Sequence, residues 1–518
     1  MPRFETPSPL TRILHLDAAL ARSPWARVAV AVLALALTVA MAYLLAGKRE
    51  VIAADTRDYL AFSPLRVFGY PTFLVMMQAI GDVRITSVVV QTALYFASSV
   101  FLALSVLRAS RSLALTLVLT VLLYGNIVTT TYNFIAVTES LITSSAMVAL
   151  GALLRFYRTR KLSWFAVICA VAVFNIVIRP AGQVYLPFLA VVAVYAWLAL
   201  RVGPIRMAAS IAVAALVSYG SINAVNHAVH GFTGTNSNHG TGLLGKAMLL
   251  APKHAGDFAG TPLQDEVAEL AAIMEPVVTR LDRMEDPRAR TLVSQTYVNY
   301  LRFGVLFPTY RERHGHADGW DRELHVRDIA GAIVEKDPLG YLELSFREFM
   351  ALVTLAPIMT ASEAEAARAD VERQAPWPYD SDESWEYEAG PRLLKMEVGI
   401  GTEQRGTATV IAFRAVYYGF YVIGIGAALV MAATMVRRRP VGWEIQMIGS
   451  CAILYGGTIT MTALGDVGGV RYLVPIWPCI AVSWICAAGW LKEMALAGGR
   501  NHAEGYAPAG PSTRRAVS

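Results

Sequence analysis

Charged residues are scarce in this sequence. Asp, Glu, Lys and Arg make up only 16% of the 518 residues, whereas 55% are hydrophobic, and the mean hydropathy is +0.46. A soluble globular protein needs more polar residues than this to cover its surface. The apolar residues come in blocks of about 20, the length of a helix that crosses a hydrocarbon core of roughly 30 Å. The composition therefore predicts a polytopic membrane protein.

Cysteine is also rare, and it lies where disulfides and zinc sites are not expected. The apolar blocks contain all four of these residues, Cys169, Cys451, Cys479 and Cys486. A disulfide framework or zinc-ligand spacing is therefore not indicated. His227, His230 and His239 lack an acidic partner at a recognised spacing. They do not predict a metal site. No cofactor is expected, and a divalent cation is not indicated.

The basic residues report membrane topology. The net charge is +6, but Lys and Arg stand at the ends of apolar blocks, so no nucleic-acid partner is expected. By the positive-inside rule, the basic connections are cytoplasmic, and both chain ends fall on that side. These connections contain Arg108 and Arg111, Arg155 to Lys161, Arg201 and Arg206, and Arg437 to Arg439.

Block lengths predict an all-α bundle of about ten spanning helices. They are expected at residues 27–46, 85–107, 112–131, 136–155, 162–178, 183–200, 207–226, 410–434, 442–463 and 471–491. The domains are a cytoplasmic segment (1–26), a transmembrane module (27–228) with a first outer loop (47–84), an extracytoplasmic insert (229–406), C-terminal spans (407–492) and a disordered cytoplasmic tail (493–518).

The insert has apolar residues at helical spacing in three stretches, 263–275, 288–303 and 339–355. We therefore expect a mostly helical domain that can rest on the bilayer.

The first outer loop holds an unusual group of polar residues. Asp55, Asp58 and Tyr59 open it, and a Gly-Tyr-Pro sequence centred on Tyr70 follows. A carboxylate at the membrane edge can take a proton from an acceptor hydroxyl or orient it. If the segment is helical, Asp55 and Tyr59 share a face and Asp58 points away. The competing interpretation is a juxtamembrane helix that Asp55 caps, with Asp58 solvated.

Three further charged residues lie near the outer ends of predicted spans. Glu139 is about one turn inside the fourth span, where an ionisable group normally faces a cavity or a partner, although Ser and Thr hydroxyls could also hold it. Arg179 ends the fifth span, and Arg471 with Tyr472 opens the last. Arginine binds phosphate in a bidentate manner, so both arginines could contact a lipid phosphate. Snorkelling or local ion pairs are the alternatives.

A Gly-rich stretch from Asn236 to Lys246 begins the insert. Its backbone amides could cradle a phosphate beside Lys246, and a simple loop is the alternative. The positions of four charged residues are more informative. Asp55, Glu139, Arg179 and Arg471 are distant in sequence, yet the predicted topology brings all four to the outer leaflet. A cavity with such a lining suits an anionic lipid substrate and a hydroxyl acceptor.

These motifs resemble the GT-C superfamily of polytopic glycosyltransferases, which includes the protein O-mannosyltransferases and the lipid A aminoarabinose transferases. The likeness covers residues 25–230 and 410–490 and rests on Asp55-x-x-x-Tyr59, Gly69-Tyr70-Pro71, Thr138-Glu139-Ser140-Leu141, and Arg471-Tyr472 with Pro475. It implies a polyprenyl-phosphate sugar donor, catalysis at the outer face, and Asp55 as base or acceptor-orienting group. Many members carry a second acidic residue beside the first, a place that Asp58 could take.

The expected activity is sugar transfer to a hydroxyl of a lipid, glycan or protein, on the periplasmic face of the inner membrane. The candidate catalytic residues are Asp55, Asp58 and Glu139. The candidate substrate-binding residues are Tyr59, Tyr70, Arg179, Lys246, Arg471 and Tyr472. One alternative is an enzyme of the O-antigen ligase or polymerase type, with its activity in the insert. The other is a transporter, although paired half-repeats and helices interrupted at the midplane are lacking.

Overall fold

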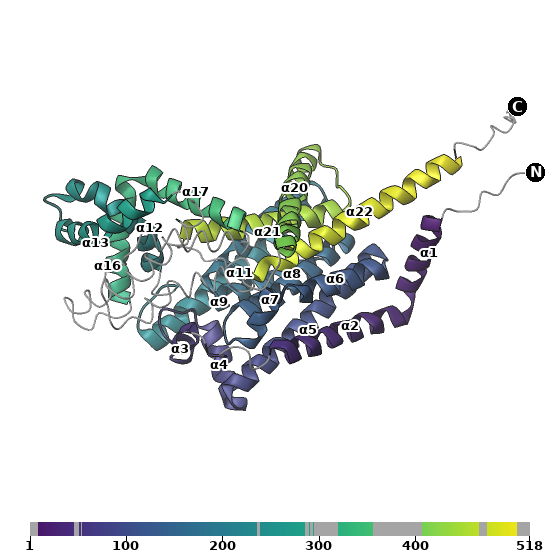
Figure 1. The fold of residues 1–518 in the computed structure, drawn as a ribbon, viewed down its shortest axis with the longest axis horizontal. Coiled ribbons are helices and arrows are strands. Elements are labelled where there is room, and N and C mark those ends of the chain that lie inside the picture. Colours follow the sequence, from purple (N-terminus) through teal and green to yellow (C-terminus); the bar gives the residue numbers. More distant parts are fainter. Residues whose placement is uncertain are drawn as a thin grey trace, which may run out of the picture.

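The computed structural model describes residues 9–45, 51–52, 54–235, 239–284, 290, 294, 320–355, 407–465 and 474–504, and all secondary structure in these ranges is helical (Figure 1). The predicted all-α class is therefore confirmed for the described part of the chain.

Eight helical segments among the described residues are long and apolar enough to cross a membrane. They correspond to α2 (Pro24–Leu45), α5 (Val83–Ser110), α8 (Glu139–Thr159), η2 (Pro180–Val184) with α10 (Tyr185–Leu198), α11 (Pro204–His230), α20 (Thr407–Arg437), α21 (Trp443–Gly465) and α22 (Trp477–Glu504). Two shorter apolar helices, α6 (Leu113–Gly125) and α9 (Leu162–Ile178), occupy the other predicted spans. The predicted span 112–131 is broken at Asn126, after which α7 (Ile127–Thr131) and η1 (Tyr132–Phe134) follow.

The helices are arranged around α8. In its most apolar window, 89% of the residues are buried, compared with 11% for α2, 17% for α11 and 22% for α20. An apolar helix with little burial inside the protein needs another apolar environment, and a bilayer provides it. The centre of the bundle is therefore α8, and α2, α11 and α20 lie at its periphery.

Four of the turns between these helices contain an arginine with φ between 50° and 59°, at Arg111, Arg160, Arg201 and Arg438. This left-handed conformation costs a non-glycine residue about 1 kcal/mol or more. It closes the helix end, as where the amide of Arg111 donates to the carbonyl of Leu107 at 3.0 Å. A cation there also complements the negative end of the helix dipole. Two of these arginines, Arg111 and Arg160, are therefore helix C-caps.

The ends of the described chain meet at one side of the bundle, where α1 (Pro9–Arg22) lies beside α22 (Figure 1). The carboxylate of Asp17 accepts from the Ser112 hydroxyl at 2.6 Å, the Ala114 amide at 2.9 Å and the Lys492 ammonium at 2.9 Å. The helix α22 extends to Glu504. The predicted disordered tail from residue 493 is thus helical in its first part, and residues 505–518 lie outside the described ranges.

The insert contains α12 (His239–His254), η3 (Ala255–Phe258), α13 (Gln264–Arg283), α16 (Trp320–Lys336) and α17 (Pro338–Leu355). These helices have their own core, which includes Leu270, Met274, Val277 and Ile333. The stretches predicted as helical at 263–275 and 339–355 are helical, whereas most of 288–303 lies outside the described residues. Figure 1 shows the insert at the end of the bundle opposite α1.

Candidate functional site

The first outer loop is folded rather than open. It contains α3 (Ala54–Leu60) and α4 (Gly69–Ile80). The hydroxyl of Thr56 on α3 donates to the carbonyl of Ala136 at 2.7 Å, and the Ala136 amide donates to the carbonyl of Val51 at 2.8 Å. These bonds fasten the loop to the segment that enters α8.

Arg66 joins the two aspartates of α3. Its Nη2 atom donates to Asp55 Oδ1 at 2.6 Å and to Asp58 Oδ2 at 2.9 Å, and its Nε donates to Asp58 at 3.2 Å. Its guanidinium lies 5.2 Å from the centroid of the Tyr59 ring. The prediction that Asp58 points away from the Tyr59 face is therefore wrong. Asp55, Asp58, Tyr59 and Arg66 form one group, which we call the first-loop cluster.

A tight turn brings Arg66 back over α3. Phe62 has φ of 52°, a conformation that is costly for an aromatic residue. The amide of Ser63 donates to the carbonyl of Asp58, and the amide of Arg66 donates to the carbonyl of Ser63, both at 3.0 Å. Sequence reasoning overlooked Arg66 as a site residue. The available signal was an arginine on the predicted outer side, where the topology rule does not require one.

The electrostatics of the cluster favour a permanently charged arginine. Burial alone would lower the pKa of Arg66, but the charge of Asp55 and its other neighbours raise it above its ordinary value. Burial also raises the pKa of Tyr59 to about 12, so this phenol stays protonated. The charges that act on it come from Arg66, Asp55, Glu139 and Arg179.

Glu139 and Arg179 form a second ion pair near Tyr59. Glu139 is in the first turn of α8, where the helix dipole favours a carboxylate, and Arg179 follows α9. Their atoms Oε1 and Nη1 are 3.0 Å apart, with 3% and 10% of the two side chains exposed. The described contact of Arg179 is thus a buried carboxylate rather than a position open to headgroups. Charges from both groups act on Tyr59, so the structure brings Asp55, Glu139 and Arg179 into one region.

Tyr70 packs against Tyr59 of the first-loop cluster. It is fully buried, its ring lies edge-on to Tyr59 with centroids 4.8 Å apart, and its hydroxyl donates to Gln91 Oε1 at 2.8 Å. The Gln91 amide in turn donates to the carbonyls of Asn133 and Ile135 at 3.3 and 3.0 Å. These contacts are those of a packing residue, although Tyr70 is a candidate for substrate binding.

Two glycines allow the elements around the site to approach closely. A Cβ atom at Gly69, where α4 begins, would collide with the carbonyl of Val177 in α9. A Cβ atom at Gly182 in η2 would collide with the backbone of Asn175. These contacts fix α4 and η2 against the end of α9, and therefore position Arg179.

Lys246 lies elsewhere, at the junction between the insert and the bundle. Its ammonium is 3.1 Å from Glu348 Oε2 on α17 and donates to the carbonyl of Ala463 on α21. The Gly-rich stretch before it is helical from His239 onward rather than an open loop. A Cβ atom at Gly240 would meet the backbone of Arg327, so this glycine serves close helix packing. Residues 236–238 lie outside the described ranges.

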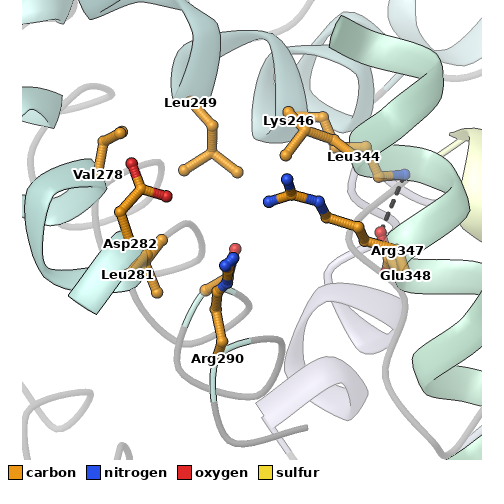
Figure 2. A pocket seen from close by; sticks show the side chains of 10 residues that line it. Lys246, Leu249, Val278, Leu281, Asp282, Arg290, Leu344, Arg347 and Glu348 are labelled. Carbon is orange, nitrogen blue, oxygen red and sulfur yellow. Dashed lines mark ion pairs between the residues drawn. The ribbon is translucent and has the colours of Figure 1, made fainter. Parts of the chain in front are cut away.

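A cavity of about 100 Å³ adjoins this lysine within the insert (Figure 2). Figure 2 shows the guanidinium of Arg347 reaching toward its middle, with Arg290 and Asp282 on other sides. The full lining is Lys246, Leu249, Val278, Leu281, Asp282, Arg290, Ser294, Leu344, Arg347 and Glu348. It is distinct from the first-loop cluster.

Arg471 and Tyr472 lie outside the described residues. In the part of the chain that is described, no group of three or more His, Cys, Asp or Glu side chains is arranged to hold a metal ion.

Comparison with family models, with curated proteins and with solved structures gave no match. The functional assignment therefore rests on the residues of this chain.

Proposed function

We propose that this protein is a membrane glycosyltransferase that moves a sugar from a polyprenyl-phosphate donor to an acceptor hydroxyl at the outer face of the inner membrane. The observation that carries the proposal is the first-loop cluster, in which one arginine holds two partly exposed carboxylates beside a second, buried ion pair. Glu139 and Arg179 lie at the ends of the apolar helices α8 and α9, and the first-loop cluster lies beside them, where a lipid headgroup would be.

The chemistry needs a base on the acceptor side. As the acceptor oxygen forms its bond to the anomeric carbon, the bond from that carbon to the phosphate oxygen breaks, and its electron pair leaves with the polyprenyl phosphate. The acceptor proton passes to Asp55, whose side chain is 20% exposed. General base assistance of this kind typically contributes roughly 100- to 10,000-fold.

Arg66 acts as a positioning residue in this scheme. It fixes the carboxylates of Asp55 and Asp58 through a rigid, planar group that stays charged. Glu139 holds Arg179 in the same region through a hydrogen bond, so this pair places one negative and one positive charge near Tyr59. The phosphate clamp is assigned to Arg471, for which the topology predicted from the sequence indicates the same side of the membrane.

An enzyme of the O-antigen ligase or polymerase type is the second candidate, because the cavity lined by Lys246, Arg290 and Arg347 lies in the insert. Its acid–base chemistry would depend on insert residues. A transporter is disfavoured, because substrate groups of transporters gather near the bilayer midplane, whereas Asp55 and Glu139 stand at helix ends.

The test is a transfer assay on purified protein in proteoliposomes, with a panel of radiolabelled polyprenyl-phosphate sugars and a mixture of lipid, glycan and peptide acceptors. We expect product from at least one donor, and loss of product in the double variant Asp55→Asn, Asp58→Asn. Arg347→Ala separates the candidates, because it should abolish product only if the insert cavity is the active site. The absence of product with every donor would contradict the proposal.

A further inference from the structure

The helix α17 leaves the core of the insert and runs beside α21. Near its start, the hydroxyl of Tyr341 donates to the carbonyl of Leu464 at 2.6 Å. Near its end, the carbonyl of Val353 accepts from the hydroxyl of Tyr421 on α20 at 3.2 Å, and that hydroxyl is 3.1 Å from the hydroxyl of Tyr455 on α21. The chain direction of α17 is therefore opposite to that of α21.

The depth of this contact follows from helix geometry. At about 1.5 Å per residue, α17 rises roughly 18 Å between Tyr341 and Val353, and α21 rises roughly 14 Å between Tyr455 and Leu464. A hydrocarbon core is about 30 Å thick. If α21 crosses the bilayer, α17 accompanies it for about half of that thickness.

One face of α17 is apolar and exposed. It consists of Leu339, Leu342, Phe346 and Met350, which we call the α17 stripe. Their spacing of three and four residues places them on one side of the helix. The opposite side holds Ser345, Glu348 and Leu352, which are buried against the insert and the bundle. Among the described residues, α17 thus has one face packed on protein and one apolar face that remains exposed.

This stripe meets the exposed face of a membrane-crossing helix. Phe346 is 61% exposed, and Val422 on α20 is 72% exposed. Tyr418, also exposed on α20, links the two helices, because its hydroxyl is 3.5 Å from the carbonyl of Thr354 at the end of α17. The exposed apolar surface of α20 continues through Ile425 and Leu429. The exposed apolar faces of α17 and α20 are therefore neighbours, and the same medium, water or lipid, covers both.

We propose that α17 enters the bilayer beside α21 and that the α17 stripe faces lipid acyl chains. The predicted extracytoplasmic insert would then lie partly within the membrane, where α17 anchors it, instead of resting on the surface.

The charged residues of α17 are compatible with this position. Arg347 is paired with Glu343 one turn away at 2.5 Å, and Glu348 is paired with Lys246 inside the protein. Unpaired charges at this depth would be costly, but paired groups near the outer leaflet are tolerated. A helix also satisfies its own backbone, so it can enter lipid without a second strand or sheet.

Spin labels can test the proposal in the full-length protein, reconstituted in vesicles of phosphatidylcholine and phosphatidylglycerol. Leu339→Cys, Phe346→Cys and Met350→Cys report on the stripe. Val422→Cys is the lipid-facing reference, and Ala268→Cys, exposed on α13, is the water-facing one. The native cysteines are buried and should take little label. If one stripe variant fails to purify, Leu342→Cys replaces it.

We expect oxygen to relax the labels at Phe346 and Met350 more strongly than a water-soluble nickel chelate does, as at Val422. The ratio should reverse at Ala268. The depth should increase from Leu339 to Met350 by up to roughly 16 Å. A nickel-accessible stripe, a stripe that neither reagent reaches because protein covers it, or equal depth along α17 would each overturn the proposal.

Discussion

Two groups of charged side chains in this molecule differ in how far water reaches them. In the first-loop cluster, the side chains of Asp55, Arg66 and Asp58 are 20%, 25% and 40% exposed. In the pair between Lys246 and Glu348, which we call the junction pair, only 3% and 5% is exposed. A partly exposed group can exchange its partner for a substrate at little cost. A buried pair cannot, because each charge that loses its partner remains desolvated.

The largest expected effect is on stability, at the junction pair. Glu348→Ala leaves the Lys246 ammonium buried without its carboxylate, so we expect the free energy of unfolding to fall by about 3–5 kcal/mol. Denaturant unfolding in detergent measures this. The control is Lys253→Ala, which breaks the ion pair between Asp337 and a lysine whose side chain is 68% exposed, and it should cost about 1 kcal/mol or less. Equal losses in the two variants would contradict the contrast between the two regions.

A second comparison separates lost charge from lost packing. Lys246→Met combined with Glu348→Leu replaces both partners by apolar groups of similar size. It should recover most of the stability lost in Glu348→Ala, because no charge then remains buried.

The next effect is on turnover, at the first-loop cluster. Asp55→Asn keeps the shape of the side chain but cannot take a proton, so we expect turnover to fall at least about 100-fold, or about 2.7 kcal/mol, with donor binding retained. Asp58→Asn should have a smaller effect, transmitted through Arg66. Asp82→Asn is the control, because Asp82 is an exposed cap of α5 and asparagine also caps. Full activity in Asp55→Asn would refute its role as base.

A smaller effect on stability is expected when the cluster loses its arginine. Arg66→Met should change the free energy of unfolding by only about 0–1 kcal/mol, since its partners can be hydrated. Turnover should nevertheless fall, and the pH profile should change, because the carboxylates lose their common support. Arg66→Lys should restore only part of the activity, since an ammonium lacks the planar fork. A loss of several kcal/mol in Arg66→Met would show that Arg66 is a structural residue instead.

The smallest effect concerns an ion-paired carboxylate of the insert, Asp337. Hydrogen bonds from Lys253, the Gly340 amide and His254 hold the pKa of Asp337 below its usual value of 3.8. A carboxyl with a lowered folded pKa stabilises the fold above its unfolded pKa, and this contribution is lost as the pH falls through the folded value. Asp337→Asn should therefore be less stable by about 1 kcal/mol at most at neutral pH, and the difference should shrink below about pH 4. Thermal unfolding of the variant and the parent protein at neutral pH and below about pH 4 measures this difference. The control is Asp265→Asn, at an exposed position. An unchanged difference at acid pH would exclude this carboxylate as its source.

The sequence predicted the helices well because block length and loop charge are local properties. The predicted spans at 27–46, 85–107 and 207–226 lie within a few residues of α2, α5 and α11. The shared face of Asp55 and Tyr59 also follows from spacing alone, and α3 is indeed helical. Eight of the described segments meet the length criterion for a membrane crossing, with α6 and α9 shorter.

The partners of the charged residues could not be predicted in the same way. Asp58 faces Arg66 only because a positive φ at Phe62 turns the chain back, and no periodicity reveals such a turn. The partner of Lys246, Glu348, is distant in sequence, and its placement depends on how α17 packs on the bundle. The glycines near Lys246 resemble a phosphate loop in composition, and only tertiary packing shows that one of them, Gly240, allows α12 to lie close to α16.

The contacts of Asp17 also bear on how the chain is assembled. Two of its partners, Ser112 and Ala114, are made early in synthesis, whereas Lys492 belongs to the last helix. Chains generally acquire structure from the N-terminus as the ribosome extends them. The amphipathic helix α1 can therefore dock early, but Asp17 gains its cationic partner only after α22 has been synthesised. This one carboxylate thus joins a segment that is made early to one that is made several hundred residues later.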